Sequence, residues 1–518
     1  MKRIITMILL SFAVLLPTYG QGRNSFEEYK RKKNSEFNKY SKKKQKNFED
    51  YRRKRNEEFA EYLRKTWIGK KAKPKIDRPK DEPQPPVIFD QETPVPVTPS
   101  PIPFDEVVPS PKPEPQPQPI EPIKEVPVPK PTPSPEPKPE PKPTPKPEPV
   151  KPAIPTQKFS IYGTEGAVRF DKSKAFRLPD ISENSVADAW LKLSGDDYTN
   201  IVVDCLNLRK ELKLGDWAYL TMINKMAKSL MGKDTNEATL LTAFVYSQSG
   251  YKMRLANENG KLRMLYASKH QIFDRPYLTL DGDFFYCLGS NPQSLKVADT
   301  KYPNEKALSL VLSEQPKLQY AQGGKKTRKS KRYPEVVTDV TVNTNLLDFY
   351  TDYPTSMLGD NVVTKWAVYG NTPLSEDVKS QLYPSLKVAI RDCSKKEAVE
   401  KLLNYVQTGF EYEYDDKVWG HDRPFFAEES LHYPYCDCED RAVLFSRLVR
   451  DLVGLDAILV FYPGHLASAV EFPGEVAGDY ISYDGRKFTV CDPTYIGAPI
   501  GLTMPNMNNA TAKVILLD

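Results

Sequence analysis

The sequence of 518 residues predicts an α+β fold in which a cysteine-bearing helix packs on an antiparallel sheet. Directly after Cys438, apolar residues recur at helical spacing from Ala442 to Leu452, and Gly454 ends the run. Short apolar segments follow, and Asp484-Gly485 between the last two is typical of a hairpin turn. The expected strands are 457–462, 466–472, 480–483 and 487–491.

Residues 1–20 have the pattern of a secretory signal peptide. Lys2 and Arg3 precede an apolar run from Ile4 to Leu16, which is too short to span a membrane stably. No cysteine lies near the expected cleavage before Gln21, so a lipid anchor is not expected. No later segment is apolar enough to be a transmembrane helix. We therefore expect a secreted or periplasmic protein.

Residues 21–72 predict a long basic helix built from repeats of eleven residues. Eleven residues span about three helical turns, so the repeated aromatic residues share one face. We expect self-association through residues 26–62 as a coiled coil, because this stripe is too narrow to stabilise a lone helix. The alternative is that the basic face binds an anionic envelope polymer or lipid surface; nucleic acid is not an expected partner. The repeated residues are Phe26, Phe37, Phe48 and Phe59, with Tyr29, Tyr40, Tyr51 and Tyr62.

Residues 73–157 read as a proline-rich linker. Of the 48 prolines in the chain, 31 lie from Pro74 to Pro155, and many of them belong to alternating Pro-Lys-Pro-Glu repeats. Such a composition predicts an extended, disordered spacer without a packed core. A ligand for a proline-binding domain is the weaker alternative.

The remaining residues are too many for one typical core and predict two domains, 158–345 and 346–518. The first half repeats the order of a helix, strands and an Asp-Gly turn, so we interpret it as a degenerate copy of the second. Aligning the two helices places Asp234 where the second half has Cys438. The same alignment places His270 nearest the position of His465, and Gly289 nearest the position of Asp492. Chance similarity of a helix and a hairpin is the alternative.

Three residues of the second half have the chemistry of a cysteine nucleophile site. Cys438, His465 and Asp492 are spaced 27 residues apart on either side of the histidine. A thiol attacks a carbonyl carbon as a thiolate, so it needs an imidazole to take its proton and a carboxylate to orient that imidazole. The start of a helix favours the thiolate, whereas Asp437 and Glu439 oppose it by like charge.

The second half resembles the bacterial transglutaminase-like branch of the papain-like cysteine hydrolases. The matching motifs are the Asp-Cys-Glu-Asp-Arg-Ala box that contains Cys438, the turn that ends at His465, and the Asp-Pro-Thr-Tyr run that begins at Asp492. The approach segment from Phe426 to Leu431 is also similar. The resemblance covers about 346–518 and implies an acyl-enzyme at Cys438, acid and base work by His465, and orientation by Asp492.

The resemblance also implies peptide amide bonds as substrates, with a protein or peptide as partner. Water as the acceptor gives peptidase or amidase chemistry, whereas a lysine amine gives acyl transfer. The backbone N–H of Cys438 is one expected oxyanion donor, and His432 and Trp419 are candidates for the second. Neither a cofactor nor a metal is expected.

Three alternatives remain open. Cys436, Cys438, His465 and Cys491 together offer the ligand types of a zinc site, although the Cys-x-Cys spacing is tight and Asp492 would have no role. A disulfide between Cys436 and Cys491 would leave Cys438 free. The third alternative is that the protein has this fold but catalyses no reaction, and serves as a noncatalytic envelope scaffold or adhesion protein.

Overall fold

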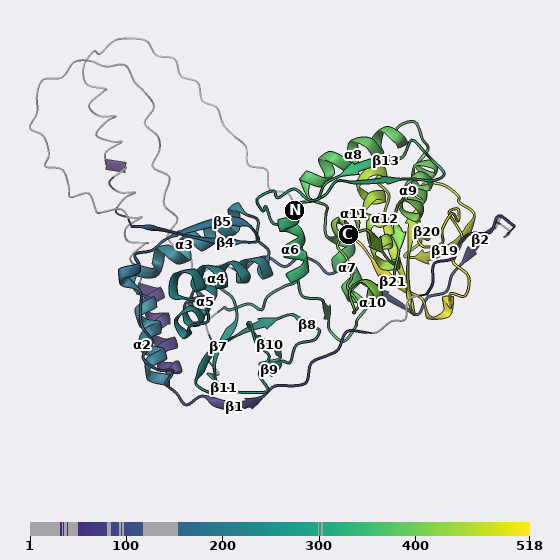
Figure 1. Ribbon diagram of the computed structural model, residues 1–518. Coiled ribbons are helices and arrows are strands. Elements are labelled where there is room, and N and C mark those ends of the chain that lie inside the picture. The colour runs from purple at the N-terminus through teal and green to yellow at the C-terminus, as the bar shows by residue number, and fades with distance from the viewer. Residues whose placement is uncertain are drawn as a thin grey trace, which may run out of the picture. The chain divides into compact units, whose positions relative to one another are not determined.

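The computed structural model describes residues 32, 33, 35, 39, 50–79, 84–92, 95, 98–117, 154–298, 300–301 and 304–518. The predicted signal peptide and the proline-rich residues 118–150 lie outside these ranges, as do Phe26, Phe37 and Phe48. The chain divides into two compact units, 1–57 and 58–518. Both main sheets and the helices that cover them belong to the second unit (Figure 1).

The basic helix includes the last residue of the repeat, Tyr62, but ends before the predicted bound at residue 72. Residues 50–63 are helical, and a strand begins at Ile68. Phe59 is 2% exposed, and its ring centroid lies 4.6 Å from that of Trp190 in the same chain. Phe59 therefore belongs to the core of this chain and not to a seam with a second helix, because burial against Trp190 removes it from the surface. Tyr62, by contrast, is 47% exposed.

The described residues between 68 and 117 form a belt along the folded residues, although most of them lie in the predicted linker. Its three strands join sheets made by the rest of the chain (Figure 1). Ile102 and Val108 are buried in cores that later residues form. The expectation of a disordered spacer is wrong for this segment, since prolines are tolerated on edge strands where no N–H is needed. The strands are β1 (Ile68–Lys71), β2 (Pro99–Pro101) and β3 (Glu106–Val108), which pair with β11, β19 and β21 respectively.

The first lobe, residues 154–318, places four helices beside a sheet. Helix α5 is buried along most of its length and packs against the β6–β7 hairpin. The elements are β4 (Thr156–Ile161), β5 (Thr164–Arg169), η1 (Lys172–Lys174), α2 (Glu183–Leu193), α3 (Asp196–Glu211), α4 (Asp216–Met231), α5 (Asn236–Gln248), β6 (Met253–Glu258), β7 (Lys261–Ser268), β8 (His270–Ile272), β9 (Leu278–Leu280), β10 (Asp283–Cys287) and β11 (Ser294–Val297).

The second lobe, residues 326–518, begins before the predicted boundary at 345. Strands β12 and β13 already belong to it, because β12 packs on α9 and β13 on α8. Its elements are β12 (Lys326–Lys329), β13 (Val337–Val340), α6 (Thr344–Asp352), β14 (Ser356–Leu358), α7 (Thr364–Asn371), α8 (Glu376–Ile390), α9 (Lys395–Gly409), β15 (Glu411–Tyr412), α10 (Asp415–Val418), α11 (Ala427–His432), β16 (Tyr435–Cys436), α12 (Cys438–Leu448), η2 (Val449–Val453), β17 (Ala457–Tyr462), β18 (His465–Glu471), β19 (Gly478–Tyr483), β20 (Arg486–Cys491), η3 (Asn509–Thr511) and β21 (Lys513–Leu516).

The predicted helix and strands of the second lobe are confirmed. Helix α12 continues through one π-helical turn to Gly454, which has a left-handed φ of 65°. The four predicted strands appear as β17 to β20 and pair antiparallel. Asp484 and Gly485 both have positive φ, 49° and 72°, as the expected tight hairpin turn requires. Helix α12 packs on this sheet through β17 and β18.

The main sheets of the two lobes have the same strand order. In the second lobe the order is β19-β20-β18-β17-β21, and in the first it is β9-β10-β7-β6-β11. In both lobes a buried helix leads into the central hairpin, β17–β18 or β6–β7. The belt adds a strand beyond the last position of each sheet, β3 in the second lobe and β1 in the first. The two lobes therefore share one topology.

His270 does not occupy the histidine position that the alignment of the two halves predicts. His465 opens β18, and the residue that opens the matching strand β7 is Lys261. His270 instead lies beyond the far end of β7, in β8, where it pairs with Leu358 of β14 in the second lobe. It is 1% exposed, and burial lowers its pKa to about 4. His270 thus belongs to the junction between the lobes.

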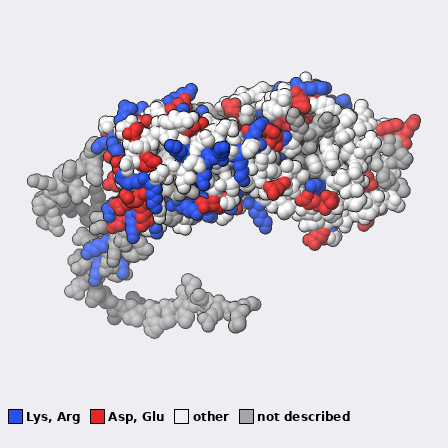
Figure 2. All heavy atoms as spheres, turned by 90° about the horizontal axis from the view of Figure 1, so that it is seen from below, with Lys and Arg blue, Asp and Glu red and all other residues white. Residues whose placement is uncertain are grey.

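Charged side chains of both signs lie interspersed on the face displayed in Figure 2. This mixture is typical of a solvated surface. In the part of the chain that the structure describes, every helix is too short or too polar to cross a bilayer.

Candidate active site

Cys438 is the first residue of α12, and the residues of its sequence box hold this helix start in place. Asp440 Oδ1 accepts a hydrogen bond from the N–H of Phe425 at 2.8 Å, and its Oδ2 accepts one from the N–H of Asp437 at 3.4 Å. Arg441 donates to the carbonyl oxygen of Phe410 at 2.9 Å. These bonds tie the approach segment to the helix, because each satisfies a buried polar group that the chain would otherwise leave unpaired.

His465 and Asp492 form a buried pair at one end of the sheet. His465 opens β18 and Asp492 follows β20, the two strands being neighbours. His465 Nε2 lies 2.8 Å from Asp492 Oδ2, and both residues are 2% exposed. The other oxygen, Oδ1, accepts from the N–H groups of Thr494 and Tyr495 at 2.8 and 3.2 Å. Asp492 therefore fixes the ring through Nε2, and Nδ1 has no hydrogen-bond partner among the described residues.

Gln407 holds the loop that carries Asp492, a role that the sequence analysis missed. Its Nε2 donates to the carbonyl oxygens of Asp492, Tyr495 and Ala498 at 3.1, 2.8 and 3.1 Å. Its Oε1 accepts from the N–H of Gly497 at 3.2 Å. The signal in the sequence is a polar residue beside Val406 on an apolar helical face. Gln407 is 1% exposed, so these bonds have no competition from water.

Cys438 and His465 line one cavity of about 1130 Å³. The belt supplies part of its wall through Lys75 and Arg78. Arg78 donates to the carbonyl oxygen of Asp422 at 2.8 Å, and the N–H of Gln84 donates to that of Gly464, next to His465, at 2.8 Å. The cavity therefore lies between the belt and the helix that bears the thiol.

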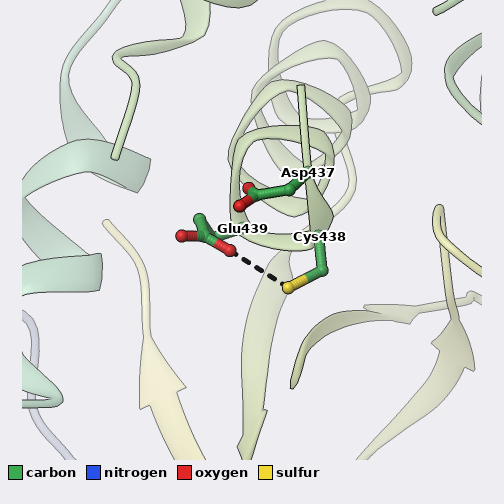
Figure 3. A group of neighbouring side chains, drawn as sticks. All are labelled: Asp437, Cys438 and Glu439. Atoms are coloured by element: carbon green, nitrogen blue, oxygen red, sulfur yellow. Dashed lines mark hydrogen bonds between the residues drawn. The ribbon is translucent and has the colours of Figure 1, made fainter. Parts of the chain in front are cut away.

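The thiol of Cys438 donates its hydrogen bond to its neighbour and not to the imidazole. Cys438 Sγ lies 3.0 Å from Glu439 Oε2, as the dashed line in Figure 3 shows. Burial, together with the negative charges of Glu439 and Asp437, raises the pKa of the Cys438 thiol well above its ordinary value of 9.0. The N–H of Leu466 favours the thiolate, but burial and like charge outweigh it. Of the two opposing effects that the sequence predicts, the like charge of the carboxylates therefore outweighs the start of the helix.

Several buried carboxyl groups gather near the start of the helix that bears the thiol. Burial and the charge of Glu439 raise the pKa of Asp415 to about 8. Burial and neighbouring carboxylates likewise raise the pKa values of Asp437 and Asp440 well above 3.8. Behind them, burial raises the pKa values of Glu428 and Glu429 in α11 to about 7. This concentration of acidic groups is a functional-site signal that the spacing of three motif residues did not reveal.

The two candidate oxyanion donors are not among the residues that line this cavity. Trp419 packs its ring against Tyr433 and under the guanidinium of Arg423, with centroid distances of 4.9 and 4.3 Å. The ring centroid of His432 lies 5.0 Å from that of Tyr433. Both side chains are therefore held by an aromatic cluster. His421, which sequence reasoning passed over, does line the cavity, and its Nδ1 lies 3.0 Å from the carbonyl oxygen of Trp419.

The zinc alternative and the disulfide alternative both fail. Cys436 Sγ donates to the carbonyl oxygen of Glu411, and Cys491 Sγ to that of Thr489. Among the described residues, the groups of three potential metal ligands that lie close together contain neither of these cysteines nor His465. All six cysteines are free thiols. Cys436 and Cys491 instead pack as small apolar side chains.

No protein-family model, curated protein or solved structure matches this chain.

Proposed function

We propose that this protein is a transglutaminase-like cysteine hydrolase or acyltransferase that acts on peptide amide bonds through Cys438. The observation that carries the proposal is the buried His465–Asp492 pair, whose histidine lines the same cavity as the thiol. Nδ1 of His465 has no partner among the described residues and is free to accept a proton. A thiol, a base and an orienting carboxylate at one cavity are the groups that acyl transfer requires.

In the proposed reaction, Cys438 Sγ attacks the carbonyl carbon of an amide. As the C–S bond forms, the thiol proton passes to His465 Nδ1, and the imidazolium then gives it to the leaving amine as the C–N bond breaks. The resulting thioester is attacked by water or by an amine, whose proton returns through His465 to the thiol. Asp492 stabilises the imidazolium through Nε2 in both steps.

The raised thiol pKa assigns the larger share of activation to His465. A resting thiolate is disfavoured by burial and by Glu439, so the proton must leave as the sulfur attacks. This is general-base catalysis and not attack by a preformed ion pair. His465 is therefore needed in the step in which the acyl-enzyme forms.

The shared strand order of the two lobes supports their origin as tandem copies, with the first copy inactive. The first lobe has no cysteine, histidine or carboxylate at the matching element ends, which are occupied by Asn236, Lys261 and Leu288. A lobe without these groups is suited to substrate binding or to partner contacts. The signal-like pattern of residues 1–20 supports a location outside the cytoplasm, where the basic N-terminal residues would meet anionic envelope polymers.

A noncatalytic scaffold or adhesion protein is the second candidate. It is favoured by one specific observation, the hydrogen bond from Cys438 to Glu439 in place of one to His465. A thiol held in this way is a poor nucleophile, because the neighbouring carboxylate disfavours the thiolate.

Incubation of the full chain with a peptide library and a fluorescent primary amine distinguishes the two candidates. We expect cleaved or amine-labelled peptides with the native protein and a loss of roughly a thousandfold or more in Cys438→Ala. Cys393→Ala is the matched control, since this partly exposed thiol lies in another segment, and it should retain full turnover. Equal product from Cys438→Ala, or none from the native protein, would refute the enzyme.

A further inference from the structure

Another hollow lies in the first lobe, where the β6–β7 hairpin meets the belt. It encloses about 550 Å³, and we call it the groove. A smaller hollow of about 300 Å³ adjoins the groove, since Asn257 and Lys296 line both. Residues of β1 and β11, which pair at the edge of the sheet, also line the groove (Figure 1). The groove is therefore built from segments that lie far apart in the sequence.

The groove lies beside the same hairpin turn as the active-site cavity of the second lobe. In both lobes the central hairpin turns through two residues. Counted from that turn, Asn257 of β6 corresponds to Phe461 of β17, and both residues line the hollow of their own lobe. Gly260 likewise corresponds to Gly464, and both of these glycines line the same two hollows. The shared topology therefore places a hollow at the same position in each lobe.

One row of cross-strand partners distinguishes the two hollows. In the second lobe the neighbour of Phe461 is Lys513 of β21, which pairs in turn with Glu106 of β3. Lys513 Nζ lies 2.8 Å from Glu106 Oε2, so this ammonium group has a counter-charge. In the first lobe the corresponding neighbour is Lys296 of β11, which pairs with Gly69 of β1. Gly69 stands where the second lobe has Glu106, so this row of the first lobe lacks the carboxylate.

The groove gathers positive charge that the protein does not neutralise. Lys70, Lys71 and Lys296 all line it, and among the described residues no carboxylate forms an ion pair with any of the three. The acidic residue of the adjoining hairpin, Glu258, is engaged elsewhere, since its Oε2 lies 2.6 Å from Nε of Arg263. A cleft lined by charges of one sign raises the local concentration of ligands of the opposite sign. The groove is therefore suited to an anion.

Neutral hydrogen-bonding side chains lie beside the lysines. Asn259 and Ser294 line the groove, and Oδ1 of Asn257 accepts the N–H of Gly260 at 3.0 Å, so its Nδ2 remains as a donor. Amide and hydroxyl groups of this kind bind the hydroxyls of sugars. The groove therefore offers partners for the uncharged part of a glycan as well as for its charges.

The smaller hollow limits the kind of anion that fits. Trp67 is the aromatic residue in the described lining of the two hollows, and it is 5% exposed, with its Nε1 donating to the carbonyl oxygen of Leu63. Nucleic-acid bases would thus find no ring on which to stack. Asp180 and Glu183 also line the smaller hollow and repel anions, which confines the negative groups of a ligand to the groove.

We propose that the groove binds an acidic polysaccharide, with the carboxylate or phosphate groups at Lys70, Lys71 and Lys296 and the sugar hydroxyls at the asparagine side chains. The site is separate from the basic repeat of residues 26–62, and it does not depend on the catalytic role of Cys438. In this arrangement the first lobe holds the protein on a polymer through the hollow that corresponds to the active site of the second lobe.

Acetylation of the lysines in the full chain, followed residue by residue by mass spectrometry, tests the site. The probes are oligogalacturonate, which carries carboxylates, and phosphomannan, which carries phosphates, with neutral dextran as the control ligand. We expect at least one of the two charged probes to protect Lys70, Lys71 and Lys296 in a saturable manner, and dextran to protect none of them. Lys513 is the internal control, because it holds the equivalent position in the second lobe and is paired with Glu106. Its rate should not change.

The substitution Gly69→Glu provides a second test, because it supplies the carboxylate that the second lobe has in this row. A Cβ at Gly69 would meet no atom within 4 Å, and the backbone there is not left-handed, so the variant should fold. We expect the affinity for the protecting probe to fall roughly tenfold in Gly69→Glu and in Lys296→Gln. Gly69→Gln adds the same bulk without the charge and should weaken binding less. Lys513→Gln is the matched control and should leave the affinity unchanged.

The outcomes separate this proposal from the catalytic one. Protection of the three lysines that persists in Cys438→Ala supports the groove, whether or not the native protein turns over a peptide. Equal acetylation of the three lysines with and without both charged probes would overturn it, as would an affinity that is unchanged in both Gly69→Glu and Lys296→Gln. A single-stranded oligonucleotide that protects the three lysines more strongly than either acidic polysaccharide would also overturn it.

Discussion

Asp492→Asn is expected to lower turnover by roughly a thousandfold to ten-thousandfold while the protein remains folded. The reason is that the new side-chain amide can keep only some of the hydrogen bonds that the Asp492 carboxylate makes. The N–H groups of Thr494 and Tyr495 require an acceptor, so the amide oxygen must stay at the position of Oδ1. The amide nitrogen then faces His465 Nε2 and donates to it. The ring is forced to carry its proton on Nδ1, where it can no longer accept the thiol proton.

The comparison for this variant is Asp479→Asn. Asp479 Oδ2 accepts a backbone N–H from Thr503 at 3.2 Å, so it has a similar structural role away from His465. Turnover should be unchanged in Asp479→Asn, and both variants should unfold at temperatures close to that of the native protein. If Asp492→Asn retains more than about a tenth of the native turnover, Asp492 does not set the tautomer of His465.

Gln407→Ala is expected to lower the free energy of unfolding by about 2–4 kcal/mol, because it leaves buried backbone groups of the Asp492 loop without partners. The carbonyls of Asp492, Tyr495 and Ala498 all lose their donor. Turnover should also fall, by about tenfold to a hundredfold, since the loop no longer holds the carboxylate in one place. Urea unfolding and steady-state kinetics on the same preparation measure the two effects.

Gln381→Ala is the matched control for the loss of turnover. Gln381 Oε1 accepts from the N–H of Thr341 at 3.0 Å, and its Nε2 donates to the carbonyl of Asp377, so it also anchors backbone. Gln381 lies on α8, away from Asp492. The substitution Gln381→Ala should therefore lower the free energy of unfolding without changing turnover. A fall in stability alone for Gln407→Ala would show that the Asp492 loop keeps its geometry without this side chain.

Local patterns made the Cys438 helix and its sheet predictable. The helical spacing after Cys438, the left-handed Gly454 and the Asp484–Gly485 turn each depend on residues close in sequence. The closeness of His465 to Asp492 was also predicted, since strands that pair bring their ends together. These features need no knowledge of distant contacts.

Long-range contacts explain what the sequence did not reveal. The belt is rich in proline, and its strand β2 contains two prolines, so only pairing with the edges of the later sheets makes this segment ordered. Phe59 matched its repeat perfectly, yet Trp190, over a hundred residues later, determines where it packs. The sequence predicted two opposing effects on the Cys438 thiol, the helix start and the like charge of its neighbours. Their balance depends on burial and on acidic groups from separate elements, which only the folded structure reveals.

Alkylation of Cys438 by iodoacetamide, followed residue by residue by peptide mapping, tests the central claim most directly. The account predicts that Cys438 reacts near neutral pH in the native protein, that its rate falls at least tenfold in His465→Ala, and that the partly exposed Cys393 reacts equally in both. Because the thiol pKa is raised, the rate in His465→Ala should recover only as the pH rises above 9. Equal labelling of Cys438 in the two proteins would show that the imidazole does not activate the sulfur.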